Sequence, residues 1–437
     1  MVDSGTKKIG TPAALAFAVS IVTGSGLLAL PGQVGLVAGQ GALWTWIIGS
    51  VLMAGILWCL YRLETYVDGS SGIHELVQAG LGRHVADYVK VLLVATFSVG
   101  IPGIALVTGN YISTMFSWTH LIPVVAIAAT VSSGLVMWLG TKSSSLFQTT
   151  TSLLSLFIVV CVVLGALWKH GSANALDNVG ATPSAASISA VGMAFFAFAG
   201  WELVTFLSKD MRGGRGAYRA VLAASWFIVV GLYLLLVVSN SLSSGDDDVL
   251  SLAAPASILG IDSTTIYSLA ALIMLASLFA NLYGYVSLIH TFSIERALPT
   301  VLSMPLFRDS AVVALPAGIG IISVVSVLGF FRDEAAAVLF SIAGVNFLLI
   351  YLLACGSLLR LCRSLAERTI SVVALGGGLV MLVASWRDLI LAIVIFVCVL
   401  LWRGMRYAKA STALPGMNSA RRLNLRNHSK QGMKGAE

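Results

Sequence analysis

The residues best suited to bind a small charged molecule lie within two long apolar runs of the sequence. The first run holds a small, flexible segment with a proline just beyond it: Thr23, Gly24, Ser25, Gly26 and Pro31. Glycine loosens a helix and proline removes a backbone donor, so we expect the helix to break here. Backbone N–H groups freed at Gly24, Ser25 and Gly26 would form the N-terminus of a half-helix, which suits a carboxylate. The alternative is a glycine-lined contact between helices.

The second run contains an alanine–glycine pair between aromatic residues, with a carboxylate directly after it: Phe196, Phe198, Ala199, Gly200, Trp201 and Glu202. Unwound backbone near Phe196 and Ala199 would offer carbonyl oxygens to an ammonium group. An acidic residue inside a membrane span is costly unless it is paired or protonated, so Glu202 is a candidate proton carrier or gate. The alternative is that Glu202 lies at a cavity edge and only bonds neighbouring helices.

The separation of the two segments indicates a repeated architecture. Gly26 and Gly200 are separated by about the length of five membrane spans. Helices broken at corresponding places in two halves of a chain are typical of inverted-repeat transporters. One broken helix would take a carboxylate and the other an ammonium. An amino acid carries both groups and is therefore the expected substrate.

The composition indicates that these segments are held by membrane-spanning helices. Of the 437 residues, 58% are hydrophobic and 10% are charged, whereas soluble proteins carry roughly a quarter charged residues. This excludes a soluble enzyme, and we interpret the net charge of +7 as cytoplasmic anchoring rather than nucleic-acid binding. The five cysteines show no metal-ligand spacing, so no disulfide, metal or cofactor is expected. The first apolar run should remain as a span and not be removed as a signal peptide.

Apolar runs separated by short polar segments predict an all-α polytopic membrane protein with about twelve spans. The spans are expected at residues 12–38, 43–62, 88–115, 121–139, 146–168, 188–208, 220–241, 264–290, 311–331, 335–359, 369–385 and 388–403. They divide the chain into an N-terminal segment (1–11), a first repeat (12–168), a second repeat (169–359), two further spans (360–403) and a basic tail (404–437).

The distribution of basic residues predicts the orientation in the membrane. If the N-terminus is cytoplasmic, all but three of the 26 lysines and arginines fall on the cytoplasmic side; the three are Lys169, Arg332 and Arg387. The positive-inside rule therefore places both termini in the cytoplasm of a cell whose inner membrane the protein spans.

The two broken segments resemble those of the amino acid–polyamine–organocation (APC) transporter family. The loop from Tyr66 to Gly72 is similar to a family loop, with Val67 in place of a proline, and residues 293–299 resemble the end of the eighth span. The loop after the sixth span departs from the family pattern, because Lys209 stands where an acidic residue is common. A short twelve-span chain, a bend at Ile101-Pro102-Gly103 and a serine-rich start to the fifth span resemble the bacterial methionine and branched-chain amino acid exporters.

The resemblance implies a LeuT-like fold of ten core spans in two inverted repeats, followed by two peripheral spans. It implies that Gly24, Ser25 and Gly26 hold the substrate carboxylate and that carbonyls of Val22, Phe196 and Ala199 face its amino group. Glu202 would couple binding to gating. The remaining expected site residues are Thr23, Phe198, Gly200 and Trp201, with Phe198 a candidate for an apolar pocket that suits Met, Leu, Ile or Val.

Several alternatives stay open. Some family members carry a lysine in the fifth span in place of sodium, and this chain has none there; Ser277 and Ser287 could instead serve sodium, although ordinary helix hydroxyls explain them. Asn281, Tyr283 and Tyr285 could face the pathway. We expect a secondary transporter and not an enzyme, because no nucleophile with its base and no ATP-binding motif is found. Export, proton- or sodium-coupled import, exchange and a non-transporting accessory role remain as alternatives, and the oligomeric state is open.

Overall fold

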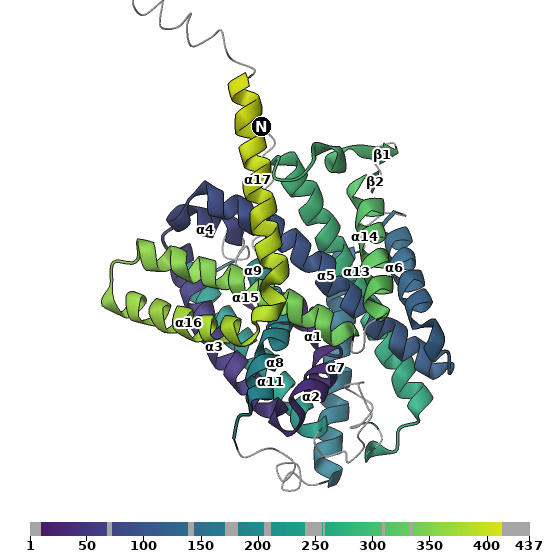
Figure 1. Ribbon diagram of the computed structural model, residues 1–437. Helices are drawn as coiled ribbons and strands as arrows, with labels where there is room; N and C mark the ends of the chain where they lie inside the picture. Colours follow the sequence, from purple (N-terminus) through teal and green to yellow (C-terminus); the bar gives the residue numbers. More distant parts are fainter. Residues whose placement is uncertain are drawn as a thin grey trace, which may run out of the picture. The chain divides into compact units, whose positions relative to one another are not determined.

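The computed structural model describes residues 10–67, 72–138, 144–170, 182–204, 211–240, 256, 258–307, 311–331 and 335–412 (Figure 1). The chain divides into two compact units, Met1–Ile390 and Leu391–Glu437. The first unit contains both broken segments. The second contains nearly all of helix α17 (Ile390–Thr412).

The first half of the chain consists of helices joined by short turns, among the residues that the structure describes. Its elements are α1 (Thr11–Gly26), α2 (Leu30–Ala38), η1 (Gly39–Gly41), α3 (Ala42–Glu64), α4 (Ile73–Leu81), α5 (Arg83–Met115), η2 (Thr119–Leu121), α6 (Ile122–Trp138) and α7 (Ser144–His170). Helix α4 is a short addition that the span prediction lacked, because nine residues are too few to cross a bilayer.

The second half continues with helices and one small hairpin. Its elements are α8 (Ala185–Ala194), η3 (Phe195–Phe198), α9 (Trp201–Val204), α11 (Gly214–Asn240), α13 (Ser263–Ile294), η4 (Thr300–Ser303), β1 (Pro305–Phe307), β2 (Ala311–Val312), α14 (Ala314–Phe330), α15 (Ala335–Leu361), α16 (Leu365–Ala384) and η5 (Trp386–Leu389). The antiparallel strands β1 and β2 pair Pro305 with Val312 and Phe307 with Ala311. This hairpin is a small exception to the all-helical expectation.

The predicted spans are confirmed as helical segments. A helix or an interrupted set of helices lies at each predicted range, among the residues that the structure describes. Within the described ranges, seven segments are long and apolar enough to cross a membrane, and four shorter apolar helices accompany them. Two of the shorter ones, Thr11–Ser20 and Ala185–Phe198, belong to the broken first and sixth spans.

Local signals in the sequence fix several helix starts. Ser184 and Ser187 form a capping box at α8, and Ser364 with Glu367 forms another at α16. In each box two side chains satisfy backbone donors that the first helical turn leaves free. At α13 the carboxylate of Asp262 accepts the backbone N–H groups of Thr264 and Thr265. These caps position the helices that carry the sixth, eighth and eleventh spans.

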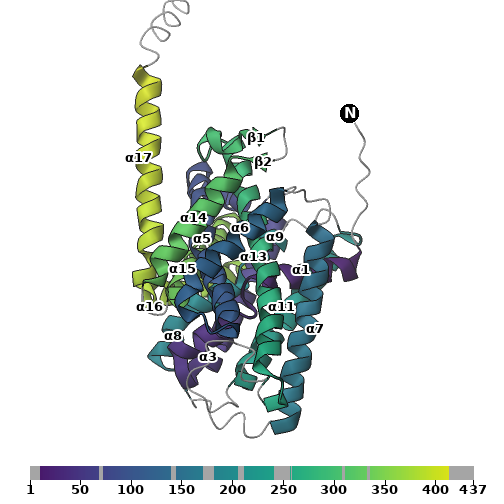
Figure 2. The ribbon, with the colours of Figure 1, turned by 90° about the vertical axis from the view of Figure 1, so that its right-hand side faces the viewer.

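Helices α5 and α15 form the buried centre of the first unit. Both pack against each other, and α5 also packs along α13. Helix α1 packs against α7 and α11, and α7 and α11 stand side by side in Figure 2. The α15 backbone approaches α8 so closely at Gly344 that a methyl group there would overlap the carbonyl oxygen of Gly192. Small residues at such points let helix backbones meet.

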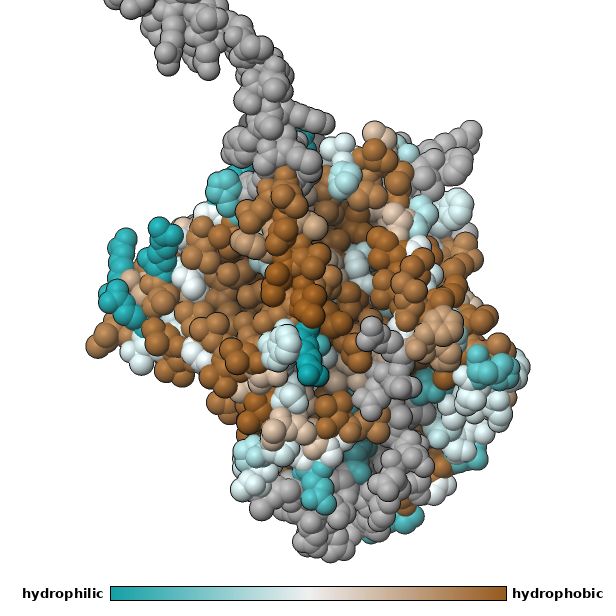
Figure 3. Space-filling view, in the orientation of Figure 1, coloured by the Kyte–Doolittle hydropathy of each residue, from teal (hydrophilic) through white to brown (hydrophobic). Residues whose placement is uncertain are grey.

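The outer faces of several helices carry large apolar side chains. On α16 the exposed set includes Val373 and Val383, which are 67% and 71% exposed, and α14 exposes Leu328. Figure 3 shows hydrophobic side chains over α16, with hydrophilic ones gathered at the outer end of the α15–α16 hairpin. Such a surface is unfavourable in water and favourable in lipid. The protein is a multi-pass membrane protein.

Candidate functional site

The first span is interrupted after Gly26, a few residues later than the sequence predicted. Residues Gly24 to Gly26 form the last turn of α1, Leu27 to Ala29 form a turn, and α2 starts at Leu30. Pro31 explains this position, because its ring lacks an N–H for the carbonyl of Leu27 and clashes with that carbonyl. The predicted N-terminus of a half-helix at Gly24 is therefore wrong: that N-terminus lies at Leu30.

The sixth span is interrupted where the sequence predicted. The α8 helix tightens into the 3-10 helix η3, Ala199 adopts an extended conformation with ψ 140°, and α9 starts at Trp201. Gly200 has φ 112°, a conformation that residues with a side chain rarely adopt. The alanine–glycine pair thus ends one helix and starts another in the middle of the span.

The two interruptions lie in direct contact. A methyl group placed on Gly26 would lie 3.0 Å from the Cα atom of Ala197 and 3.0 Å from the hydroxyl oxygen of Tyr233. Only glycine permits this approach of α1 to η3. The contact joins the two segments that the sequence singled out, although they are far apart along the chain.

The predicted site residues that the structure describes are buried. Val22, Thr23, Phe196, Phe198, Ala199 and Trp201 are at most 5% exposed, and Gly26 and Gly200 are buried as well. The side chains of Ser25 and Glu202 lie outside the described residues, and so does the burial of Gly24. The roles predicted for these three residues therefore stay predictions.

The two phenylalanines of the sixth span face different neighbours. The ring of Phe196 lies 5.1 Å from that of Phe340 on α15, and a methyl group on Gly100 of α5 would overlap it. The ring of Phe198 lies 6.2 Å from Trp46 on α3 and 6.3 Å from Tyr233 on α11. Phe196 therefore reaches toward the third and tenth spans, whereas Phe198 packs among the second and seventh.

Some polar atoms of the predicted site have partners within the protein. The carbonyl of Phe196 accepts the N–H of Ala199 at 3.1 Å, and that of Phe198 accepts the hydroxyl of Tyr351 at 3.0 Å. The hydroxyl of Thr23 donates to the carbonyl of Val19 at 2.7 Å. A substrate ammonium at Phe196 would share the Phe196 carbonyl oxygen with the N–H of Ala199 or replace that N–H.

Sequence reasoning missed three residues beside the two breaks. Gly100 accommodates the Phe196 ring, Tyr351 donates to the Phe198 carbonyl, and the hydroxyl of Tyr233 faces Gly26. The two tyrosines had a sequence signal, because each places a polar group in an otherwise apolar span. Gly100 had no sequence signal, because the need for a glycine there depends on how closely the Phe196 ring approaches α5.

Several of the candidates on α13 have hydrogen-bond partners within the protein. The hydroxyls of Tyr285 and Ser98 form a hydrogen bond of 2.5 Å. Asn281 donates its amide to the carbonyl of Ser277, and Ser287 donates its hydroxyl to that of Tyr283. Ser287 therefore makes the ordinary bond of a helix hydroxyl.

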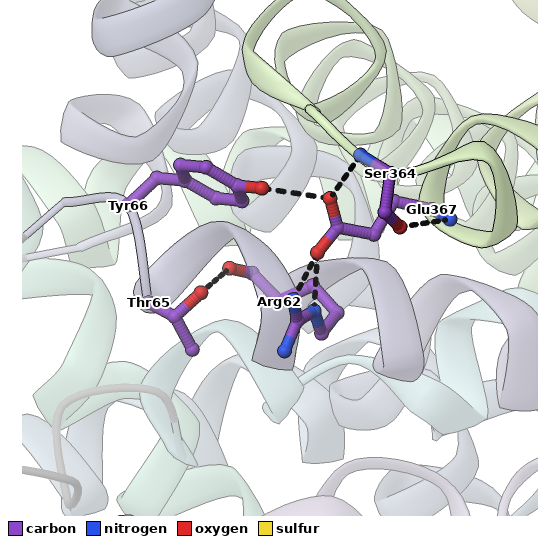
Figure 4. Close-up of polar contacts among 5 residues, drawn as sticks. All are labelled: Arg62, Thr65, Tyr66, Ser364 and Glu367. Atoms are coloured by element: carbon purple, nitrogen blue, oxygen red, sulfur yellow. Dashed lines mark hydrogen bonds and ion pairs between the residues drawn. The ribbon is translucent and has the colours of Figure 1, made fainter.

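A second polar cluster joins the end of α3 to the start of α16 (Figure 4). The Nε of Arg62 donates to one carboxylate oxygen of Glu367 at 2.6 Å, and its Nη2 donates to the same oxygen. Tyr66 donates its hydroxyl to the other oxygen at 2.7 Å, and the N–H of Ser364 also reaches it. The hydrogen bond to Glu367 raises the pKa of Tyr66. Every oxygen of this buried carboxylate is satisfied, so the cluster fastens two helices.

The fold and the paired breaks define a class: a helical membrane protein with interrupted spans that meet inside the bundle, as in secondary transporters. A family model described as amino acid permease matches residues 9–416, so the chain belongs to the amino acid permease family of the APC superfamily.

Several curated relatives are similar to parts of the chain. The serine/threonine exchanger SteT of Bacillus subtilis is 26% identical over 54% of this chain and 55% of its own length. The L-methionine/branched-chain amino acid exporter YjeH of Escherichia coli is 22% identical over 48% of this chain and 50% of its own length. The inner membrane transport protein YbaT of Escherichia coli is 23% identical over 70% of this chain and 74% of its own. The chain spans about half the length of the exchanger and of the exporter that it matches.

Proposed function

We propose that the protein is a secondary active transporter that moves neutral apolar amino acids, such as Met, Leu, Ile and Val, out of the cell. The observation that carries this proposal is the contact of the two broken spans at Gly26 and Ala197. Broken helices that meet in this way supply both backbone donors and backbone acceptors inside a membrane. An amino acid presents one group for each.

The substrate lies between the two breaks. Its carboxylate lies at the turn that follows Gly26, beside the N-terminus of α2 at Leu30, and its ammonium faces carbonyls of Val22, Phe196 and Ala199. The carbonyl of Phe196 exchanges its bond with the N–H of Ala199 for the ammonium. Trp201, Phe198, Thr23 and Gly200 complete the site.

The surroundings of Phe196 favour an apolar substrate side chain. Phe340 and Phe347 lie 5.1 and 6.1 Å from its ring, and Gly100 closes the other side. None of these neighbours carries a charge. A charged substrate side chain would lose its hydration here without gaining a partner.

Transport proceeds by alternating access. The spans that contain the two breaks rock against the rest of the first unit and expose the site to each side of the inner membrane in turn. Glu202 couples this movement to a proton or sodium ion. The termini lie in the cytoplasm, and the basic tail lies along the anionic inner leaflet.

A second candidate function is amino acid exchange, which the similarity to the serine/threonine exchanger favours. Import coupled to protons or sodium uses the same site with the opposite gradient. A non-transporting accessory role is a remote alternative, since it leaves the two breaks without a purpose.

The test is export from cells loaded with dipeptides that contain Met or Leu. Cells that produce the protein should hold less free Met or Leu inside and release more outside than cells that produce Gly26→Val at equal membrane abundance. Release that requires an external amino acid would favour exchange. Equal internal and external levels in both strains would contradict export.

A further inference from the structure

Three buried polar groups beside the breaks have no hydrogen-bond partner among the described residues. They are the indole N–H groups of Trp46 and Trp201 and the hydroxyl of Tyr233. A buried donor without a partner is unfavourable, because it has lost its hydrogen bonds to water. Buried groups without a partner need a physical explanation, and one explanation is a bound molecule that accepts hydrogen bonds from them.

Tyr233 stands out because its surroundings fix where its hydroxyl lies. Its ring stacks on Trp46 with centroids 4.3 Å apart and planes 12° apart, and Phe198 packs edge-on at 6.3 Å. The residue is fully buried. The hydroxyl oxygen is 3.0 Å from the position that a methyl group on Gly26 would occupy. It therefore faces the point where α1 meets η3.

Packing alone does not account for this hydroxyl. Two other buried tyrosines use theirs: Tyr351 donates to the Phe198 carbonyl, and Tyr285 pairs with Ser98. A phenylalanine at position 233 would keep both ring contacts and avoid the cost of an unpaired donor. The hydroxyl is thus available to a group that enters between Gly26 and Ala197.

We propose that Tyr233 is a substrate-binding residue whose hydroxyl donates a hydrogen bond to the carboxylate of the transported amino acid beside Gly26. This inference rests on the proposed function. A carboxylate is the fitting acceptor, because a phenolic donor forms a stronger bond with an ionised oxygen than with a neutral one. Separation of Gly26 from Ala197 would admit the carboxylate next to the hydroxyl.

The experiment compares Tyr233→Phe with the wild-type protein in proteoliposomes. Competition against labelled L-methionine, L-leucine and L-serine gives the affinity for amino acids, and L-methioninol, which lacks the carboxylate, serves as the matched ligand. We expect about a tenfold weaker affinity for the amino acids, an unchanged affinity for L-methioninol, and a thermal midpoint at least equal to that of the wild type. Tyr285→Phe is the control and should lose thermal stability without losing affinity.

The outcomes separate this inference from the proposed function. If the wild-type protein binds none of the three amino acids, the proposed function fails, and the inference fails with it. If the wild type binds but Tyr233→Phe retains full affinity, Tyr233 is not a substrate ligand and the transporter assignment stands. An equal loss for L-methionine and L-methioninol, with a lower thermal midpoint, would give Tyr233 a structural role and overturn the inference.

Discussion

The two polar junctions of the first unit differ in how they treat their hydrogen-bonding groups. At the α3–α16 junction, Glu367 receives donors from Arg62, Tyr66 and Ser364 (Figure 4). At the junction of the broken spans, Tyr233 and Trp46 keep donors without partners among the described residues. A satisfied junction gains nothing from an added molecule, whereas an unsatisfied one does. The α3–α16 junction is suited to holding two helices together, whereas the junction of the broken spans is suited to binding and releasing a molecule that accepts hydrogen bonds.

The strongest test of this contrast is Gly26→Val. Its side chain would meet Ala197 and Tyr233, so we expect transport to fall to the level of empty vesicles while the protein still inserts. Gly35→Val is the matched control in the same span, because a methyl group there meets nothing within 4 Å. Uptake and release in proteoliposomes give the rates. Normal transport by Gly26→Val would remove the broken spans from the site.

Loss of the satisfied junction should affect stability and not affinity. Glu367→Ala removes the acceptor of Arg62 and Tyr66 and half of the capping box of α16. Because Arg62 is 35% exposed and can turn to water, we expect a loss of about 2 kcal/mol, less than for a fully buried pair. Unfolding in detergent measures it. Glu295→Ala breaks the pair with Lys90 by removing a carboxylate that is 36% exposed and should cost less than Glu367→Ala; an equal or larger loss there would undo the distinction.

Glu202→Gln tests the coupling role. If the carboxyl group carries the proton, the variant should transport at a rate that no longer varies between pH 5 and 8, roughly the range in which perturbed carboxyl groups titrate. Initial rates in proteoliposomes at several pH values measure this. A variant that keeps the wild-type pH profile would exclude Glu202 from coupling.

The smallest expected effect is that of Tyr66→Phe, which removes one hydrogen bond from a junction that keeps its ion pair. The expected loss is about 0.5–1.5 kcal/mol. Because folding raises the pKa of Tyr66, its contribution is present below the ordinary value of about 10 and is lost as pH rises through the folded value. Wild-type stability should therefore fall more steeply above about pH 10 than that of the variant. Parallel curves would contradict the bond to Glu367.

The helices were predictable because long apolar runs and short polar loops leave few alternatives in a membrane. The break at Gly200 was predictable too, since an alanine–glycine pair interrupts the run. The break in the first span was misplaced because its position depends on the carbonyl of Leu27, four residues before Pro31, and not on the glycines themselves.

The arrangement around the site was harder to predict. Phe196 and Phe198 were assigned to one site, but residues two apart on a helix face different sides. The contact of Gly26 with Tyr233 depends on the packing of α1 against α11, for which the sequence has no signal. The pairing of Arg62 with Glu367 joins residues 305 positions apart, and no local pattern predicts it.

That separation has a consequence for the synthesis of the protein. At about 5–20 residues per second, Glu367 leaves the ribosome roughly 15 to 60 s after Arg62. Until then the guanidinium of Arg62 lacks its carboxylate partner, and its long stem lets the charge reach lipid phosphates or water. The α3–α16 junction therefore forms late in biogenesis. In a nascent chain that ends before α16, Arg62 would have no Glu367 carboxylate to pair with.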